Sequence, residues 1–114
     1  MNRYIVGLGL LLAACVPSVD ACRVGAANTA GVIHLDRSIL NDREAAEFVL
    51  AHEFFHVWTG SSSEAMADDF AEESVIYRGL SPCPAARILK ACGLRDRAEA
   101  LGVRNRCAGF GGVT

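Results

Sequence analysis

The sequence predicts a small, mostly helical α+β domain. The stretch AAEFVLAHEFFHVW repeats apolar residues at helical spacing, and the preceding run VIHLD, bounded by turn-forming residues, is typical of a strand. Three further helical segments, separated by glycines, follow. We therefore expect a small N-terminal β-ribbon packed on one long helix, an antiparallel second helix and a C-terminal helical pair, stapled by disulfides.

The length of 114 residues indicates one domain with a small core, which a metal or disulfides would help to stabilise. The formal net charge is −2 and the arginines are scattered along the chain. Because nucleic-acid binding needs a basic surface, we expect no nucleic-acid partner.

Residues 1–14 are predicted to be a signal peptide, because Arg3 precedes an apolar run too short to span a bilayer. The residues Leu12–Cys15 resemble a bacterial lipobox, whose cysteine becomes the lipidated first residue of the mature protein. We therefore expect an exported bacterial protein, lipid-anchored to the cell envelope through Cys15. The alternative is cleavage after Ala21, which would give a soluble periplasmic or secreted protein.

Export places four further cysteines in an oxidising compartment, where they are candidates for disulfides. Cys83 and Cys92 lie at opposite ends of one predicted helix, roughly 13 Å apart, which is too far for a bond between them. Their partners are then Cys22 and Cys107, in one of two arrangements that remain open.

The β-ribbon is expected to pair a short stretch at 22–24 with Val32–Asp36, across turn-forming residues around Asn28 and Gly31. Residues 15–27 would be the N-terminal tether and the start of the ribbon, and 28–107 the folded domain that carries the candidate catalytic residues.

The long helix is predicted to begin at Asn41, an N-cap residue with Glu44 three positions later. Its apolar row continues into His52, so the histidines should face the interior. Gly60 is placed to end the helix in a left-handed turn.

A second helix is predicted from about Ser63 to Arg78, so that it forms a tight hairpin with the first. A third helix begins near Pro82 and stops at Gly93, and a fourth runs from about Arg95 to Leu101. The glycine-rich segment 108–114 is expected to be a flexible tail.

The central chemistry lies in His52, Glu53 and His56, which form the zinc-peptidase pattern H-E-x-x-H. Two histidines four residues apart on a helix can reach one zinc ion, while Glu53 flanks a bound water. A catalytic zinc needs a third protein ligand. Glu64, in the first turn of the second helix, is the leading candidate, and Asp68 would fall opposite His52 and hold its imidazole.

Other roles are open for several of these side chains. Glu64 also fits a capping box with Ser61, and Asp69 is a reserve third ligand. His34 and Tyr77 are candidates for contact with substrate or transition state, although a structural role is favoured for each. The aromatic residues Phe54, Phe55 and Trp58 are expected in the core or in a groove wall.

The residues HEFFH followed by EAMAD resemble the gluzincin pattern, H-E-x-x-H with a downstream E-x-x-x-D, and the small chain resembles the minigluzincins. The resemblance implies zinc ligation by His52, His56 and Glu64, general-base chemistry by Glu53, and a hydrogen bond from His52 to Asp68. The spacer between His56 and Glu64 is shorter than in many gluzincins.

The predicted function is that of an exported zinc metallopeptidase with one zinc ion and a peptide or protein substrate. Peptide bonds would be hydrolysed through a zinc-bound water with Glu53 as general base. We also expect Val32–Asp36 to serve as an edge strand for an extended peptide. The alternative is a non-catalytic lipoprotein in which the histidine pair binds structural zinc or only packs helices.

Overall fold

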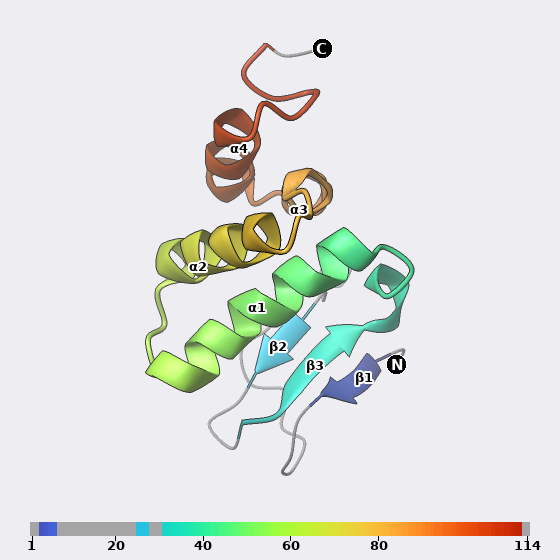
Figure 1. Cartoon of the computed structure of the whole chain (residues 1–114), viewed down its shortest axis with the longest axis vertical. Coiled ribbons are helices and arrows are strands. Elements are labelled where there is room, and N and C mark those ends of the chain that lie inside the picture. The colour runs from blue at the N-terminus through green and yellow to red at the C-terminus, as the bar shows by residue number, and fades with distance from the viewer. Residues whose placement is uncertain (1–2, 7–24, 28–30, 113–114) are drawn as a thin grey trace.

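The computed structural model describes residues 3–6, 25–27 and 31–112, which form a small sheet, four α-helices and a short 3-10 helix (Figure 1). This arrangement confirms the predicted α+β, mostly helical class. The elements are β1 Arg3–Val6, β2 Gly25–Ala27, β3 Ile33–Asp36, η2 Arg37–Ile39, α1 Arg43–Thr59, α2 Glu64–Tyr77, α3 Cys83–Ala91 and α4 Arg95–Arg104.

The sheet has the order β1-β3-β2, and both pairings are antiparallel. The strand β3 is therefore central, so the expectation that Val32–Asp36 provides a free edge does not hold in this structure. The pairing partner in the ribbon is Gly25–Ala27, which follows the stretch 22–24 that was predicted to pair. The strand β1 lies within residues 1–14, and their role as a signal peptide stays a prediction.

One face of the sheet packs on α1 (Figure 1). Alternate residues of a strand point to opposite faces, and Ile33 and Leu35 share a buried cluster with Ile39 and Val49. The same contact explains why β2 begins with a glycine, because a Cβ on Gly25 would overlap Val49 of α1. The sheet backbone can thus approach the helix closely.

The helix α1 begins one residue later than predicted. Its N-cap is Asp42, whose carboxylate accepts a hydrogen bond from the backbone N–H of Ala45 at 3.1 Å. Glu44 does not complete a capping box and instead accepts from the backbone N–H of Ser81 at 2.6 Å, which ties the start of α1 to the loop before α3.

The turn after α1 forms as predicted. Gly60 has φ 72°, and its N–H donates to the carbonyl of His56. Ser63 then caps α2 by accepting from the backbone N–H of Met66 at 3.2 Å. Ala67 and Ala71 are fully buried, which lets α2 lie close against α1.

The second buried cluster joins the four helices. It contains Phe48, Ala71, Val75, Ala85, Ala86, Leu89, Ala98, Leu101, Cys107 and Phe110. The disulfide between Cys83 and Cys107 has a Cα–Cα distance of 5.5 Å and closes this helical unit. It selects one of the two predicted arrangements, and Cys92 is disulfide-bonded as well. The helix α4 runs three residues beyond its predicted end.

The described part of the C-terminal segment, residues 108–112, is anchored at Phe110, within the region 108–114 that was expected to be a flexible tail. Phe110 is only 1 % exposed, and a Cβ on Gly102 of α4 would overlap its ring. Lys90 donates to the carbonyl of Gly109 at 3.0 Å and lies 5.0 Å from the centre of the Phe110 ring. One aromatic side chain therefore anchors a segment whose glycines suggested mobility.

The proposed lipidation site Cys15, the cysteine Cys22 and the cleavage site after Ala21 lie outside the described residues. Within the ranges that the structure does describe, every helix is too short or too polar to cross a bilayer.

Candidate metal centre

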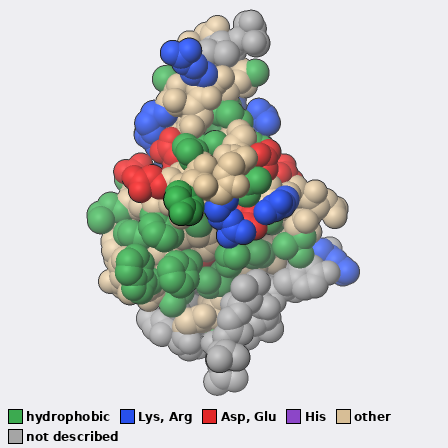
Figure 2. All heavy atoms as spheres, in the orientation of Figure 1, with side chains coloured by type: hydrophobic (Ala, Val, Ile, Leu, Met, Phe, Trp, Pro, Cys, Tyr) green, Lys and Arg blue, Asp and Glu red, His purple; other side chains and the backbone are tan. Residues whose placement is uncertain are grey.

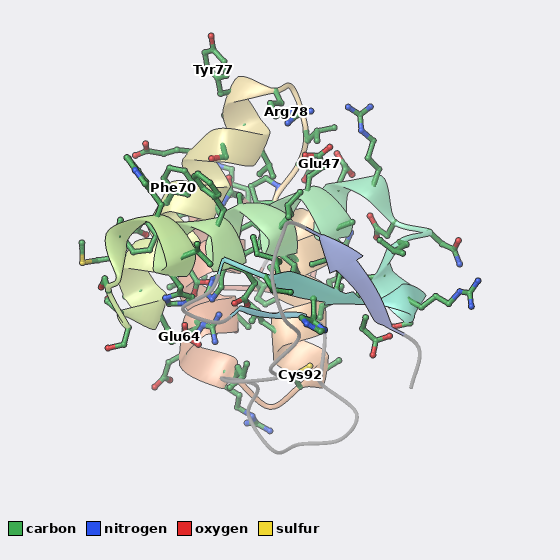
Figure 3. The ribbon with its side chains drawn as sticks, turned by 90° about the horizontal axis from the view of Figure 1, so that it is seen from below. Glu47, Glu64, Phe70, Tyr77, Arg78 and Cys92 are labelled. Atoms are coloured by element: carbon green, nitrogen blue, oxygen red, sulfur yellow. A yellow bond between two sulfur atoms is a disulfide. The ribbon has the colours of Figure 1, made fainter. Side chains whose placement is uncertain are left out.

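Three side chains from α1 and α2 converge on one point. His52 and His56 lie one turn apart on α1. Glu64, which is labelled in Figure 3, is the first residue of α2. The Nε2 atoms of the two histidines are 3.1 Å apart, and Glu64 Oε1 is 3.2 Å from His52 Nε2 and 2.7 Å from His56 Nε2. The three predicted ligands thus form a candidate metal-binding triad.

The spacing of these atoms suits a small metal ion. Bonds of about 2.0–2.1 Å at tetrahedral angles place neighbouring ligand atoms roughly 3.3 Å apart. The observed separations of 2.7 to 3.2 Å are slightly shorter, so only a small outward movement of the side chains would be needed.

The hydrogen bonds at the Nδ1 atoms of His52 and His56 determine which ring nitrogens present lone pairs to a metal. His56 Nδ1 is 2.8 Å from the carbonyl oxygen of Ser61, and His52 Nδ1 is 2.8 Å from a carboxylate oxygen of Asp68. Both oxygens can only accept, so each Nδ1 carries the hydrogen. In the neutral imidazoles both Nε2 atoms therefore present lone pairs, beside a carboxylate oxygen. Three electron-pair donors in contact require a cation or a proton between them.

The pKa values of His52 and Glu64 are shifted in the directions that favour a proton on His52 and a negative charge on Glu64. Burial lowers the pKa of His52, but hydrogen bonds to Asp68 and Glu64 and the charge of Glu53 raise it to about 9. The hydrogen bond from His52 lowers the pKa of Glu64 to about 2, against the opposing effect of burial, and the charge of Arg97 adds to the lowering.

The turn between α1 and α2 reverses the chain and also places a backbone carbonyl against His56. Gly60 reverses the chain, so that the carbonyl of Ser61 points back at His56. The N–H of Ser61 donates to Thr59 Oγ1 at 3.0 Å, and not to Glu64. The capping-box alternative for Glu64 is therefore wrong, because its carboxylate contacts the histidines.

Asp68 lies where the hairpin geometry predicted, one turn along α2 from Glu64. It is 5 % exposed and holds His52 Nδ1. Burial raises its pKa, but hydrogen bonds from His52 and Arg97 outweigh that effect and hold the pKa below its usual value. Asp68 is thus an ionised acceptor that fixes the orientation of the first histidine.

Arg97 of α4 completes the site and was missed in the sequence. Its Nε and Nη2 donate to the two oxygens of Asp68 at 2.7 and 3.0 Å, and its Nη1 donates to Glu64 Oε2 at 3.2 Å. A signal was present, because Arg97 stands three residues after Leu94 and four before Leu101, within the apolar face of its helix. A charged residue in that row needs a buried partner.

Glu53 lies beside the triad without joining it. Its Oε2 is 3.9 Å from His52 Nε2, and the residue is 9 % exposed. Burial raises its pKa, and the nearby imidazoles of His52 and His56 partly offset that rise. The strand β2 covers it, since a Cβ on Gly25 would lie 3.4 Å from Glu53 Cγ.

Three of the other candidates are not brought to the triad. Asp69 pairs with Arg104 at 3.4 Å. Tyr77 is 93 % exposed at the opposite end of α2, roughly 20 Å from Glu64 along the helix (Figure 3). His34 is buried in β3, where strand alternation turns it away from the face that packs on α1.

The aromatic residues of α1 divide between two environments. Phe55 is buried, whereas Phe54 and Trp58 are 46 % and 66 % exposed and stack with ring centres 6.0 Å apart. On a helix, positions 54 and 58 lie opposite the face that carries His52 and His56. Figure 2 shows hydrophobic side chains gathered over α1 on the surface. Phe54 and Trp58 are therefore not part of the core, and they lie on a face of α1 turned away from the triad.

Comparison of the chain with models of known protein families, with characterised proteins and with solved structures finds no match.

Proposed function

We propose that this protein is a zinc-dependent peptidase of the gluzincin type, with His52, His56 and Glu64 as metal ligands and Glu53 as general base. The observation that carries the proposal is the convergence of three electron-pair donors beside a buried carboxylate. A triad alone would suit any metal-binding protein. The adjacent Glu53 is what favours hydrolysis.

Zinc is favoured by the chemistry of the ligands. Two imidazoles and one carboxylate suit zinc, whereas calcium and magnesium prefer sites made of oxygen alone. Three protein ligands also leave a fourth position for water or substrate, which distinguishes a catalytic zinc site from a closed structural one. Glu64 lies on the accessible side, with its side chain 45 % exposed.

When bound, zinc would supply Lewis-acid chemistry that acidifies a water molecule and polarises a peptide carbonyl. Glu53 would accept the proton of the attacking water at its carboxylate and pass it to the leaving amine. Its Oε2 lies 3.9 Å from His52 Nε2, so the carboxylate can reach a water molecule beside the proposed ligands. Asp68 and Ser61 hold the hydrogens on the two Nδ1 atoms, so the Nε2 lone pairs stay available.

The experiment compares purified parent protein with the Glu53→Gln variant. We expect one zinc per chain in both, and cleavage of unstructured peptide substrates that is at least about a hundredfold slower in the variant, since general-base catalysis contributes about that much or more. Glu47→Gln is the matched control. It makes the same chemical change on the same helix, at a carboxylate that pairs with Arg78 at 3.2 Å, and should leave cleavage unchanged.

Parent protein without bound metal would refute the metal centre. Undiminished cleavage by Glu53→Gln would refute the assigned base. Zinc binding by a parent that cleaves no peptide would favour the alternative, a non-catalytic protein with structural zinc.

We also propose export and lipid attachment at Cys15. The disulfide between Cys83 and Cys107 supports export, because such bonds persist in oxidising compartments. The lipobox-like residues Leu12–Cys15 support the anchor. Incorporation of an acyl-chain label should be lost in Cys15→Ser, and a label retained in that variant would exclude this residue.

A further inference from the structure

We infer that Arg97 is the positioning residue of the metal centre. A single guanidinium from α4 would set the orientation of one histidine ligand, through Asp68, and of the carboxylate ligand Glu64. The inference rests on the proposed metal site and adds to it a residue outside the sequence motif.

The contact with Asp68 fixes a plane. Arg97 Nε donates to Oδ2 at 2.7 Å and Nη2 to Oδ1 at 3.0 Å, which is the two-point pairing of a guanidinium with a carboxylate. The same Oδ1 lies 2.8 Å from His52 Nδ1. Because both oxygens of Asp68 are held, the carboxylate cannot rotate, and the ring of His52 is directed by a fixed acceptor.

The contact with Glu64 selects which oxygen faces the histidines. Arg97 Nη1 donates to Oε2 at 3.2 Å, and Oε1 is left toward His52 and His56. The side chain of Glu64 is 45 % exposed, so packing alone does not hold it. The arginine therefore favours ligation through one oxygen and opposes rotation of the carboxylate into solvent.

The task suits arginine and not lysine. A guanidinium directs several N–H groups in fixed directions, and here three of them reach two carboxylates. An ammonium group would keep the charge, but it lacks the planar fork that holds Asp68 at two points. Arg97→Lys thus separates the effect of charge from the effect of geometry.

The chain contains a matched control on the same helix. Arg104 of α4 makes a similar two-point contact with Glu72 of α2, at 3.3 Å from Nε to Oε2 and 2.7 Å from Nη2 to Oε1. Glu72 is not part of the triad, and it also accepts from Asn105 at 2.7 Å. Arg104→Gln removes the ion pairs with Glu72 and Asp69 between the same two helices, and Arg104 contacts neither the candidate ligands nor Asp68.

The test measures zinc affinity by competition with a chromogenic chelator, for the parent, Arg97→Gln, Arg97→Lys and Arg104→Gln, each shown to be folded by circular dichroism. We expect Arg97→Gln to bind zinc about 10- to 100-fold more weakly, which is the usual effect of losing a partner of a metal ligand. Arg97→Lys should also bind more weakly than the parent, and Arg104→Gln should match the parent.

A second readout uses cobalt in place of zinc, since the visible absorption of bound cobalt depends on its coordination. We expect this spectrum to change in Arg97→Gln and to be preserved in Arg104→Gln. A role of Arg97 in helix packing alone would leave the spectrum unchanged.

Zinc affinity of Arg97→Gln equal to that of the parent would overturn the inference, as would an equal loss in Arg104→Gln. If Arg97→Gln does not fold, Arg97→Lys provides the test. Zinc affinity of Arg97→Lys equal to that of the parent would show that the planar guanidinium group is not required. A parent that binds no zinc would remove the proposed function itself, whereas a parent that binds zinc regardless of Arg97 would remove only this inference.

Discussion

The hydrogen bonds at the two Nδ1 atoms decide what the triad can bind. A carbonyl and an ionised carboxylate hold the hydrogens there, so both Nε2 atoms turn lone pairs toward Glu64. Without metal, a proton on His52 relieves the repulsion between these atoms. Protons and metal ions are therefore expected to compete for the same place.

This competition predicts how the stability of the metal-free protein depends on pH. The pKa of His52 is about 9 in the folded chain, against an ordinary value of 6.5. Its protonation therefore stabilises the fold fully below about pH 6.5, and that stabilisation is lost as the pH rises through 9. We expect the free energy of unfolding, measured with urea in the presence of a chelator, to fall between about pH 6.5 and 9.5.

The control for this prediction is His52→Gln, which cannot gain the proton and should lose the pH dependence. Zinc affinity of the parent should rise over the same interval, with proton release on binding. A metal-free parent whose stability is flat or rises over that interval would contradict the assignment.

The hairpin of α1 and α2 was predictable because its signals are local. Gly60 favours the left-handed turn, Ser63 is a good N-cap, and helical spacing aligns His52 and His56. Together these features are enough to predict that Glu64 and Asp68 lie beside the histidines. The fold class follows from the same kind of signal.

Two element boundaries differ from the sequence-based predictions: the start of α1 and the position of β2. The first depends on a choice between two similar N-cap residues, and the second depends on strand pairing. Asn41 and Asp42 are equally good caps, and only the geometry of the chain selects Asp42. The strand at Gly25–Ala27 is short, and its position depends on its pairing with β3 and on the space beside Val49. Neither choice is determined locally.

Contacts distant in sequence were beyond prediction for a different reason. Arg97 is 29 residues from Asp68, and Phe110 finds its place on α4 only because Gly102 has no side chain. The glycine-rich composition of the C-terminal segment suggested a flexible backbone. Composition could not reveal that the Phe110 ring packs against Gly102 of α4.

The docking of Phe110 on α4 gives a prediction for Gly102→Ala. Alanine favours a helix over glycine by about 1 kcal/mol, yet the added methyl would overlap the Phe110 ring. We expect a net loss of about 1–3 kcal/mol of stability, as for other overpacked sites. Denaturant unfolding of the parent and the variant measures it.

The matched experiment repeats Gly102→Ala in a Phe110→Leu background. A narrower side chain leaves room for the methyl, so the cost of the alanine should shrink or reverse sign. Equal costs in both backgrounds would show that the ring does not occupy the space above Gly102.

At the scale of the whole molecule, the centre joins two parts of the chain. The hairpin of α1 and α2 supplies the candidate ligands and Glu53, while α4 supplies Arg97 from within the segment closed by Cys83 and Cys107. The disulfide therefore restrains the part of the chain that carries the positioning residue, and its effect should appear in the stability of the metal-free protein.

We expect the double variant Cys83→Ser, Cys107→Ser to lose roughly 3.5 kcal/mol of stability, the value for closing a loop of 24 residues. In the proposed site zinc binds only the folded chain, so zinc at about a hundred times its dissociation constant should return roughly 2.7 kcal/mol. Denaturant unfolding with zinc and with chelator measures both effects. If the metal-free double variant is as stable as the metal-free parent, the predicted effect of the disulfide is wrong. If zinc does not stabilise the double variant, the predicted effect of zinc is wrong.

The short connection at Gly60 has a consequence for the order of assembly. His52 and Glu64 are 12 residues apart, whereas Arg97 and Asp68 are separated by 29. Loop-closure entropy grows with the logarithm of this separation, so the contact to Arg97 costs about 0.8 kcal/mol more to close. Loop-closure entropy alone therefore favours forming the contact between His52 and Glu64 before the contact between Asp68 and Arg97.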